Sequence, residues 1–227
     1  MTARPNNLPL LMRRQALAGL AALPAAGLTV AANAQAASPR PPTPRQSLGP
    51  FYPRDASERP RQTDADLLAV DGDRVLSRGV PLHLTGRVLD RQGRPVADAG
   101  VEIWQCDANA VYHHPAGGAV SERDPNFQGY GRAQTDRDGA FHFRTIRPVP
   151  YPGRTPHIHA RVEARGYSTL GTQLYLADDP GNARDFLFRQ LSSDERAQLT
   201  LALRRTESAH PLARATQFSA SCELVLA

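Results

Sequence analysis

The chain contains no lysine, and all 27 of its basic residues are arginine. Reactions that need a lysine amine are therefore excluded, among them Schiff-base catalysis and phosphate binding by a lysine-bearing glycine-rich loop. Cysteine is scarce as well, because Cys106 and Cys222 are the only two and stand far apart. They could form a disulfide or be two buried free thiols, and their spacing is not that of a zinc site.

Basic charge is in small excess once the N-terminal segment is set aside. Cleavage near Ala36 removes Arg4, Arg13 and Arg14 and no acidic residue, which leaves 24 basic and 22 acidic residues and a net charge near +2. The remaining chain has no basic run interleaved with aromatic side chains. We therefore expect no nucleic-acid partner.

Residues 1–36 have the features of an export signal. Arg13 and Arg14 precede a moderately apolar run that is interrupted by proline and glycine and ends in Ala-x-Ala sequences near Ala36. The segment resembles a twin-arginine signal peptide, and a stable membrane anchor is not expected. These features predict cleavage of the segment and export to the periplasm.

The rest of the chain divides into a proline-rich arm, residues 37–80, and a β-domain, residues 81–227. Apolar and polar residues alternate in the domain, and turn sequences rich in glycine and aspartate separate the alternating runs. Strands are expected at 82–88, 101–104, 140–145, 158–163, 169–176 and 218–226. The fold class is therefore predicted as all-β, a β-sandwich of mostly antiparallel strands with long loops and at most short helices.

Two local signals refine this prediction. Thr135-Asp136-Arg137-Asp138-Gly139 is typical of a hairpin turn before the strand at 140–145. Ser192-Ser193-Asp194-Glu195 has the spacing of a capping box and predicts a short helix that extends through Leu203.

The most informative sequence is His157-Ile158-His159 with the proline-rich run before it. Residues i and i+2 of an extended segment lie on one face, so both imidazoles can reach one metal ion while Ile158 points into the opposite layer. Tyr151 could supply an anionic oxygen. Four prolines hold the approach extended: Pro148, Pro150, Pro152 and Pro156. An isolated His-x-His also occurs on ordinary strands, so the prediction of a metal site depends on this context.

Five motifs follow one another along the chain. They are Gly49-Pro50-Phe51-Tyr52-Pro53, then Val101-Glu102-Ile103-Trp104-Gln105 with Asn109-Ala110-x-Tyr112, then Asp124-Pro125-Asn126-Phe127 with Gly131-Arg132, then Thr135-Asp136-x-Asp138-Gly139, and finally Tyr151-Pro152 with Arg154-x-Pro156-His157-Ile158-His159. Together they resemble the intradiol ring-cleaving dioxygenases, and most of all the protocatechuate 3,4-dioxygenase subunits. The resemblance covers about residues 45–226.

The resemblance implies a mononuclear Fe(3+) site with four protein ligands, Tyr112, Tyr151, His157 and His159. It implies that Tyr151 is the labile ligand, that Arg154 stabilises negative charge on the substrate ring, and that Gln173 supports the site from beside it. A hard ferric ion favours anionic phenolate donors. The expected enzyme inserts both atoms of O2 into a catechol-type substrate and cleaves between the two hydroxylated carbons, which gives a cis,cis-muconate-type diacid.

The chain departs from the resembling proteins at two positions near the expected site. Val111 stands where an arginine is common, and Gly153 stands where a tryptophan is common, so one wall of the substrate pocket should differ. Proline-rich sequence replaces the N-terminal helical dimerisation domain of the catechol dioxygenases. The resemblance therefore implies a homo-oligomer or a complex with a related subunit, acting on a small aromatic diol and O2.

A second interpretation comes from the turn motifs alone. They are also similar to those of carboxypeptidase-regulatory and transthyretin-like modules, which suggests an exported, non-catalytic β-sandwich with zinc on His157 and His159. Those modules do not require the tyrosine pair. Colour separates the two interpretations, since ferric tyrosinate absorbs visible light and a zinc site does not.

Overall fold

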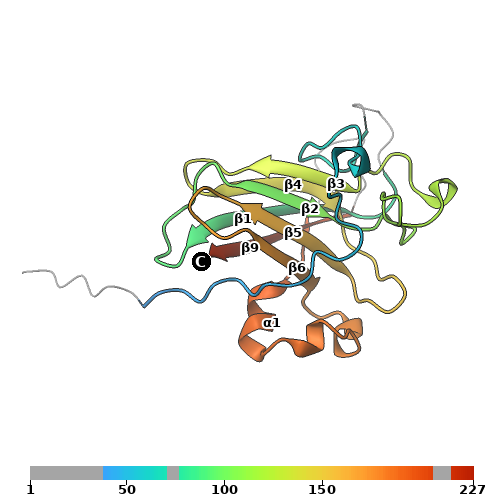
Figure 1. Cartoon of the computed structure of the whole chain (residues 1–227). Helices are drawn as coiled ribbons and strands as arrows, with labels where there is room; N and C mark the ends of the chain where they lie inside the picture. The colour runs from blue at the N-terminus through green and yellow to red at the C-terminus, as the bar shows by residue number, and fades with distance from the viewer. Residues whose placement is uncertain (1–37, 71–76, 207–215) are drawn as a thin grey trace, which may run out of the picture. The chain divides into compact units, whose positions relative to one another are not determined.

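A computed structural model describes residues 38–70, 77–206 and 216–227, so the export signal interpreted in residues 1–36 lies outside the described residues. One sheet contains, in order, β4 (Ala140–Ile146), β1 (Pro81–Asp90), β9 (Gln217–Leu226) and β8 (Arg204–Thr206). The other contains β3 (Tyr130–Gln134), β2 (Gly100–Trp104), β5 (His157–Glu163), β6 (Leu170–Leu176) and β7 (Thr200–Leu201). The two sheets form the layers of the domain in Figure 1, and the prediction of an all-β sandwich is confirmed.

Most neighbouring strands are antiparallel, as the sequence predicted. Two pairings in the described part are parallel, that of β1 with β9 and that of β6 with β7. The pairing of β1 with β9 joins segments that are far apart in the chain, and its register places Leu84 beside Ala220. The fold is therefore closed by a contact between its first and last long strands.

The core lies between the inner faces of the two sheets. Leu82 and Leu84 of β1 are fully buried, whereas His83 and Thr85, which alternate with them, point to the other side of the strand. Ile103 and Ile158 of the second sheet belong to the same apolar cluster. This alternation follows from the two-residue period of a strand, and burial of the apolar side chains supplies the main stabilisation.

The turn before β4 has the expected hairpin form. The Asp136 carboxylate accepts hydrogen bonds from the backbone N–H groups of Asp138 and Ala140, at 2.9 and 2.8 Å. Gly139 has a φ of +71°, which glycine adopts without the steric cost that a side chain brings. The hairpin prediction is confirmed.

Helical structure is short throughout the described residues. The helix α1 (Ser193–Leu199) begins at Ser192, whose side chain accepts from the N–H of Glu195 in a capping box. It ends before the expected Leu203 because the chain then extends into β7, which pairs with β6. Single turns of 3-10 helix form η1 (Ala56–Glu58), η2 (Val120–Glu122), η3 (Pro180–Ala183) and η4 (Phe188–Gln190). None of the described helices has the length and apolar character needed to cross a membrane.

The proline-rich arm packs along the domain and enters its core. Backbone hydrogen bonds join Thr43 to Val225 of β9 and Gln46 to Gly171 of β6, and the arm runs past β6 in Figure 1. Leu67 and Leu68 near its end are fully buried in the main cluster. The arm thereby carries its central residues to the end of the domain where the loops after β2 and β4 meet.

Candidate metal centre

Two strands and two loops bring the predicted ligands to one place. His157 and His159 lie on β5, which pairs with β2 so that His159 is opposite Trp104. Tyr112 follows β2 in a loop, and Tyr151 stands in the loop between β4 and β5. The structure thus joins residues that are up to 47 positions apart in the chain.

The loop after β2 returns to the site through a turn centred on Asp107. The Asp107 carboxylate accepts from the N–H groups of Asn109 and Val111, at 2.9 and 3.0 Å, and Asp107 N donates to the Val111 carbonyl. Ala110 takes a positive φ of 65° within this turn. Aspartate side chains favour such turns because they supply the acceptor that the backbone lacks. The turn delivers Tyr112 back toward β5.

The four side-chain rings of the candidate ligands converge and form a ring cluster, which consists of Tyr112, Tyr151, His157 and His159. Ring centroids lie 4.8 Å apart for His157 and His159, 5.5 Å for Tyr151 and His157, and 5.5 Å for the two tyrosines. Tyr112 Oη is 3.4 Å from His157 Nε2. Two donors that each bind one ion at about 2.1 Å are about 3 to 3.5 Å apart, so this separation suits a shared metal ion.

The imidazoles are prepared as neutral donors. His157 Nδ1 lies 2.7 Å from the Thr155 carbonyl, so it carries the proton and donates it there, which leaves the Nε2 lone pair free. Burial, followed by the charge of Arg154, lowers the pKa of His157 to about 4. Burial and the neighbouring His157 lower the pKa of His159 well below its usual value. Only a neutral imidazole binds a metal ion.

His159 is held by packing instead of hydrogen bonds. Its ring stacks on Trp104 with 4.8 Å between centroids and 6° between planes. Its Nδ1 is buried and has no hydrogen-bond partner among the described residues. Gly49 of the arm also lies close to the ring, since a Cβ added there would stand 3.3 Å from His159 Cε1. A buried polar atom without a partner is costly, so the ring is kept in place by its packing against Trp104 and Gly49.

The two phenols have unequal surroundings. Tyr112 is only 4% exposed, and burial raises the pKa of its phenol well above the usual value. Tyr151 is half-buried; burial also raises its pKa, although Arg154 acts in the opposite direction. Without a cation both phenols stay protonated at neutral pH, and a bound metal ion would favour the phenolates.

Arg154 connects the four rings to the residues behind them. Its Nη1 lies 3.4 Å from both Tyr151 Oη and His157 Nε2, and its Nη2 donates to Gln173 Oε1 at 2.6 Å. Gln173 stands opposite His159 in the pairing of β5 with β6, so the two side chains share a face. Both residues therefore lie beside the candidate ligands.

Asp185 completes this network and was missed by the sequence analysis. Arg154 Nε donates to its carboxylate at 2.7 Å, and the side chains of the pair are 8% and 0% exposed. Burial acts to raise the pKa of Asp185, but the N–H of Phe188 and the Arg154 guanidinium hold it below its usual value. Asp185 belongs to an irregular segment between η3 and η4, and no pattern in the sequence marked it.

The proline-rich arm forms one side of the ring cluster. The sequence did not predict this role for the arm. Phe51 stacks on Tyr112 with 4.3 Å between centroids and 20° between planes, and meets Tyr151 edge-on. Tyr175, opposite His157 on β6, donates to Gln46 of the arm at 2.9 Å. Residues 46–51 therefore close one side of the ring cluster.

Comparison with known proteins decides the family. A family model described as a dioxygenase matches residues 49–224. The protocatechuate 3,4-dioxygenase beta chain of Burkholderia cepacia is 37% identical over 164 residues, 65% of this chain and 70% of that one. The chain belongs to the intradiol ring-cleavage dioxygenase family.

Other members of this dioxygenase family agree with the assignment. The hydroxyquinol 1,2-dioxygenase of Rhizobium sp. (strain MTP-10005) is 33% identical over 159 residues, 62% of this chain but only 50% of that protein. Among solved structures, the dioxygenase domain of a dioxygenase carbohydrate-binding protein fusion from Streptomyces sp. SirexAA-E is 33% identical, with a TM-score of 0.58, and covers 82% of this chain and 98% of its own. The prediction of an enzyme of this family is confirmed, and the non-catalytic module is not supported.

The remaining candidate donors of the dioxygenase lie outside the ring cluster or form no site. In the described part of the chain, no three His, Cys, Asp or Glu side chains are grouped so that they could hold a metal ion. Cys106 and Cys222 are both free thiols, which decides the alternative left open by the sequence. His83 and His142 face each other on the outer side of β1 and β4, and His210 lies outside the described residues. A metal at the ring cluster therefore needs the phenol oxygens, and their chemistry fits a ferric ion.

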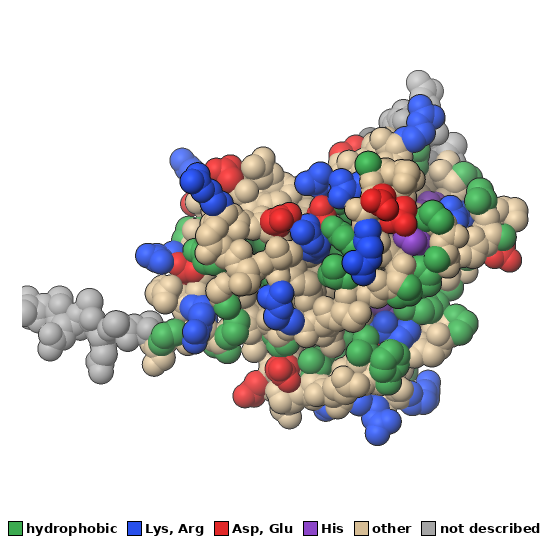
Figure 2. Space-filling model, viewed as in Figure 1, with side chains coloured by type: hydrophobic (Ala, Val, Ile, Leu, Met, Phe, Trp, Pro, Cys, Tyr) green, Lys and Arg blue, Asp and Glu red, His purple; other side chains and the backbone are tan. Residues whose placement is uncertain are grey.

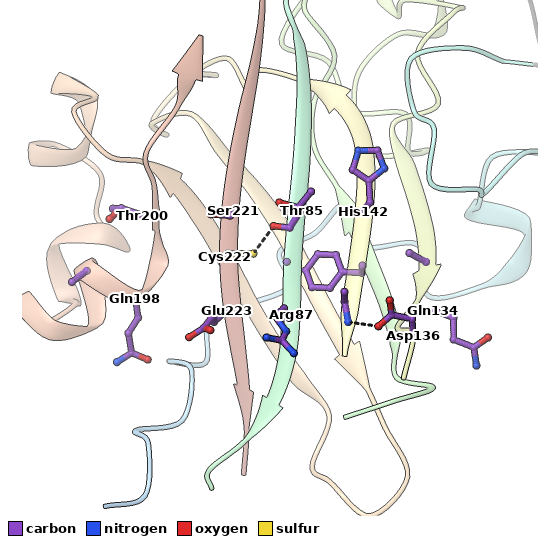
Figure 3. Close-up of a pocket in the computed structure, with 15 residues that line it drawn as sticks. Thr85, Arg87, Gln134, Asp136, His142, Gln198, Thr200, Ser221, Cys222 and Glu223 are labelled. Atoms are coloured by element: carbon purple, nitrogen blue, oxygen red, sulfur yellow. Dashed lines mark hydrogen bonds between the residues drawn. The ribbon is translucent and has the colours of Figure 1, made fainter. Parts of the chain in front are cut away.

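A surface pocket lies on another part of the molecule, away from the ring cluster. Its volume is about 930 Å³, and Figure 3 shows polar side chains from β1, β4 and β9 around it. None of the predicted site residues lines it. Size alone therefore does not identify the site of this dioxygenase; the converging phenols and imidazoles do.

Proposed function

We propose that the protein is a non-haem Fe(III) intradiol dioxygenase that inserts both atoms of O2 into a catechol-type diol and yields a cis,cis-muconate-type diacid. The observation that carries the proposal is the convergence of Tyr112, Tyr151, His157 and His159 in a member of this family. Protocatechuate and hydroxyquinol are named in the descriptions of its relatives.

These four side chains would hold the ferric ion. When bound there, the ion supplies a Lewis-acidic centre on which a chelated diol becomes reactive toward O2. Two phenolates offset two of its three positive charges, and the buried setting tolerates a nearly neutral centre better than a charged one.

The protein's own residues then have separate tasks. Tyr151 Oη is the more accessible phenol oxygen and is placed to accept a proton from an entering diol. The Arg154 guanidinium, 3.4 Å from that oxygen, supplies a fixed positive charge for the negative charge that develops on the ring. Gln173 and Asp185 hold the guanidinium, while Phe51 and Trp104 exclude water from Tyr112 and His159.

Isotope-labelled turnover tests the proposal. The iron-loaded protein is supplied with catechol under ¹⁸O2, and the product mass is measured together with the oxygen consumed. Incorporation of two labelled atoms into a ring-opened diacid, with one O2 consumed per diol, is expected. A quinone product without label, or no oxygen uptake, contradicts the proposal.

We also propose that residues 1–36 direct the chain to the periplasm through the twin-arginine route. The arginine pair, the moderate apolar run and the Ala-x-Ala sequences support this. Replacing Arg13 and Arg14 by lysine should retain the full-length chain in the cytoplasm, measured by fractionation and intact mass. Export of the lysine variant at the original level contradicts the proposed route.

Assembly as a homo-oligomer or with a related subunit is proposed as well. Its support is the likeness to a protein named as a beta chain. The mass of the purified protein in solution tests the first form, and a monomer that turns over catechol unaided contradicts both.

A further inference from the structure

Beside Arg154 the surface is hollowed into a cleft of about 470 Å³. Its walls are the turn after Tyr151 and the segment 179–185, and they include Pro150, Gly153, Arg154, Pro156, Pro180 and Arg184. Because Arg154 Nη1 also lies 3.4 Å from Tyr151 Oη and His157 Nε2, the cleft adjoins the candidate iron site. Its volume is in the range of pockets that take small organic molecules.

Gly153 lines the cleft and leaves open space beside it. A Cβ added at this position would meet no atom within 4 Å, and the residue is exposed. Its φ of +82° is a conformation that L side chains rarely adopt, so the backbone itself keeps the position small. The surface beside Gly153 therefore has room for part of a ligand.

Prolines line the cleft, and an exposed aromatic ring, here called the rim, lies near Arg154 of its wall. Phe186 is 57% exposed, and its ring lies 5.5 Å from the Arg154 guanidinium carbon. Three of the lining residues are prolines. Exposed aromatic surface beside a cleft marks a place where an apolar group of a ligand gains from burial.

Of the four charged side chains that line the cleft, two form an ion pair with each other, Arg154 and Asp185. Asp185 holds Arg154, and Asp179 Oδ1 accepts from Gly181 N and Thr155 Oγ1, at 2.8 and 3.2 Å. Arg184 is exposed on the wall. An apolar substituent in the cleft therefore does not have to separate the ion pair of Arg154 and Asp185.

We propose that the site selects catechols that carry a bulky, mainly apolar ring substituent, which leaves the site over Gly153 and lies in this cleft against Phe186. The inference rests on the ring-cleaving function proposed above and names its substrate class. It assigns Gly153 and Phe186 as specificity-determining residues.

The first test compares two diols on the iron-loaded full-length protein. Binding of catechol and of 4-phenylcatechol is measured by calorimetry without oxygen, and kcat/KM is measured as oxygen uptake. We expect tighter anaerobic binding and about a tenfold or greater advantage in kcat/KM for 4-phenylcatechol, the scale on which an apolar pocket discriminates.

Matched variants locate the substituent. Gly153→Asn fills the open space, and Gly166→Asn is its control, because Gly166 has a φ of +85° and likewise no atom within 4 Å of an added Cβ. Phe186→Ala removes the rim, and Val120→Ala is its control, since Val120 is a second exposed large apolar residue at 75%. Gly153→Asn and Phe186→Ala should each lower the preference for 4-phenylcatechol several-fold and retain catechol turnover. The two control variants should keep the wild-type preference.

The outcomes separate this inference from the function on which it rests. Turnover of catechol without a preference for 4-phenylcatechol, or equal selectivity in Gly153→Asn and Gly166→Asn, overturns the proposed substrate class alone. Anaerobic binding of both diols without any oxygen uptake overturns the ring-cleaving function, and the substrate class falls with it.

Discussion

Tyr112 and Tyr151 are chemically identical side chains that the fold places in different surroundings. Tyr112 is nearly inaccessible and stacked under Phe51, whereas Tyr151 is half-buried in a proline-framed loop and lies within reach of Arg154. A buried donor is slow to leave a metal, and an accessible donor can exchange with a ligand. The two phenols should therefore contribute differently to iron retention and to substrate binding.

Replacing each tyrosine by phenylalanine separates these contributions. Tyr151→Phe should retain iron near one per chain but bind catechol more slowly, because the exchangeable phenol is gone. Tyr112→Phe should change the resting visible spectrum and lose iron, because a buried donor is missing. Iron content and stopped-flow anaerobic binding measure both effects, and wild-type behaviour of both variants would reject the assigned roles.

Asp185 is a positioning residue that acts through Arg154. Asp185→Asn removes the charge of the partner, so the guanidinium should lose its fixed orientation, and kcat should fall about 10- to 100-fold with a smaller change in KM. Asp179→Asn is a suitable control, since Asp179 belongs to the same segment and bonds to Thr155 but not to Arg154. Steady-state kinetics and thermal unfolding of both variants check this; equal kcat in the two would leave Asp185 with only a structural role.

At the scale of elements, Gly139 in the hairpin before β4 has a matched control in Gly166, which lies between β5 and β6. A Cβ at Gly139 would stand 2.5 Å from the Val88 carbonyl oxygen, whereas Gly166 has the same kind of φ and open space around it. Gly166→Ala should lower the free energy of unfolding by about 1 kcal/mol, the cost of the backbone conformation alone. Gly139→Ala should cost clearly more, and urea unfolding of the two variants measures the difference. Equal losses would mean that the turn yields without strain.

The elements that the sequence predicted are those with a strong local pattern. The alternation in β1, the turn at Gly139 and the cap at Ser192 each depend on neighbouring residues, and the structure contains all three. The parallel pairing of β1 with β9 was not predicted, because it depends on packing between segments more than a hundred residues apart. Short β7 also has too few residues to show a period.

The candidate site divides in the same way. The candidate ligands and Arg154 were predicted from the family resemblance of their motifs, and the structure places them close together. Asp185 and the stacking of Phe51 on Tyr112 follow from the paths of an irregular segment and of the arm, which no local pattern encodes. The family resemblance therefore predicted which residues belong to the candidate site, whereas the contacts between them could be seen only in the folded structure.

At the scale of the whole molecule, the buried histidines make the metal-free protein sensitive to acid. Burial lowers the pKa of His157 to about 4 and that of His159 well below its usual value, whereas histidines of the unfolded chain take up protons near pH 6.5. The unfolded state therefore binds more protons below that pH. The free energy of unfolding should fall as the pH drops from 6.5 towards 4, by about 3 kcal/mol from His157 alone.

Urea unfolding of the metal-free protein across this range measures the effect. The lowered pKa of Asp185 acts in the same direction, but only at lower pH, where that carboxylate is protonated. His157→Gln should show a shallower decline between pH 6.5 and 4 than the wild type. Equal slopes in the two proteins would show that His157 is protonated without cost to the fold.

The visible spectrum of the protein during titration with iron tests the central claim most directly, because it reports whether phenol oxygens bind the metal. The account predicts a phenolate-to-iron charge-transfer band that grows to saturation at one Fe(3+) per chain and is altered in Tyr112→Phe. A protein that binds one ferric ion and stays colourless, or whose band is unchanged without Tyr112, would contradict it.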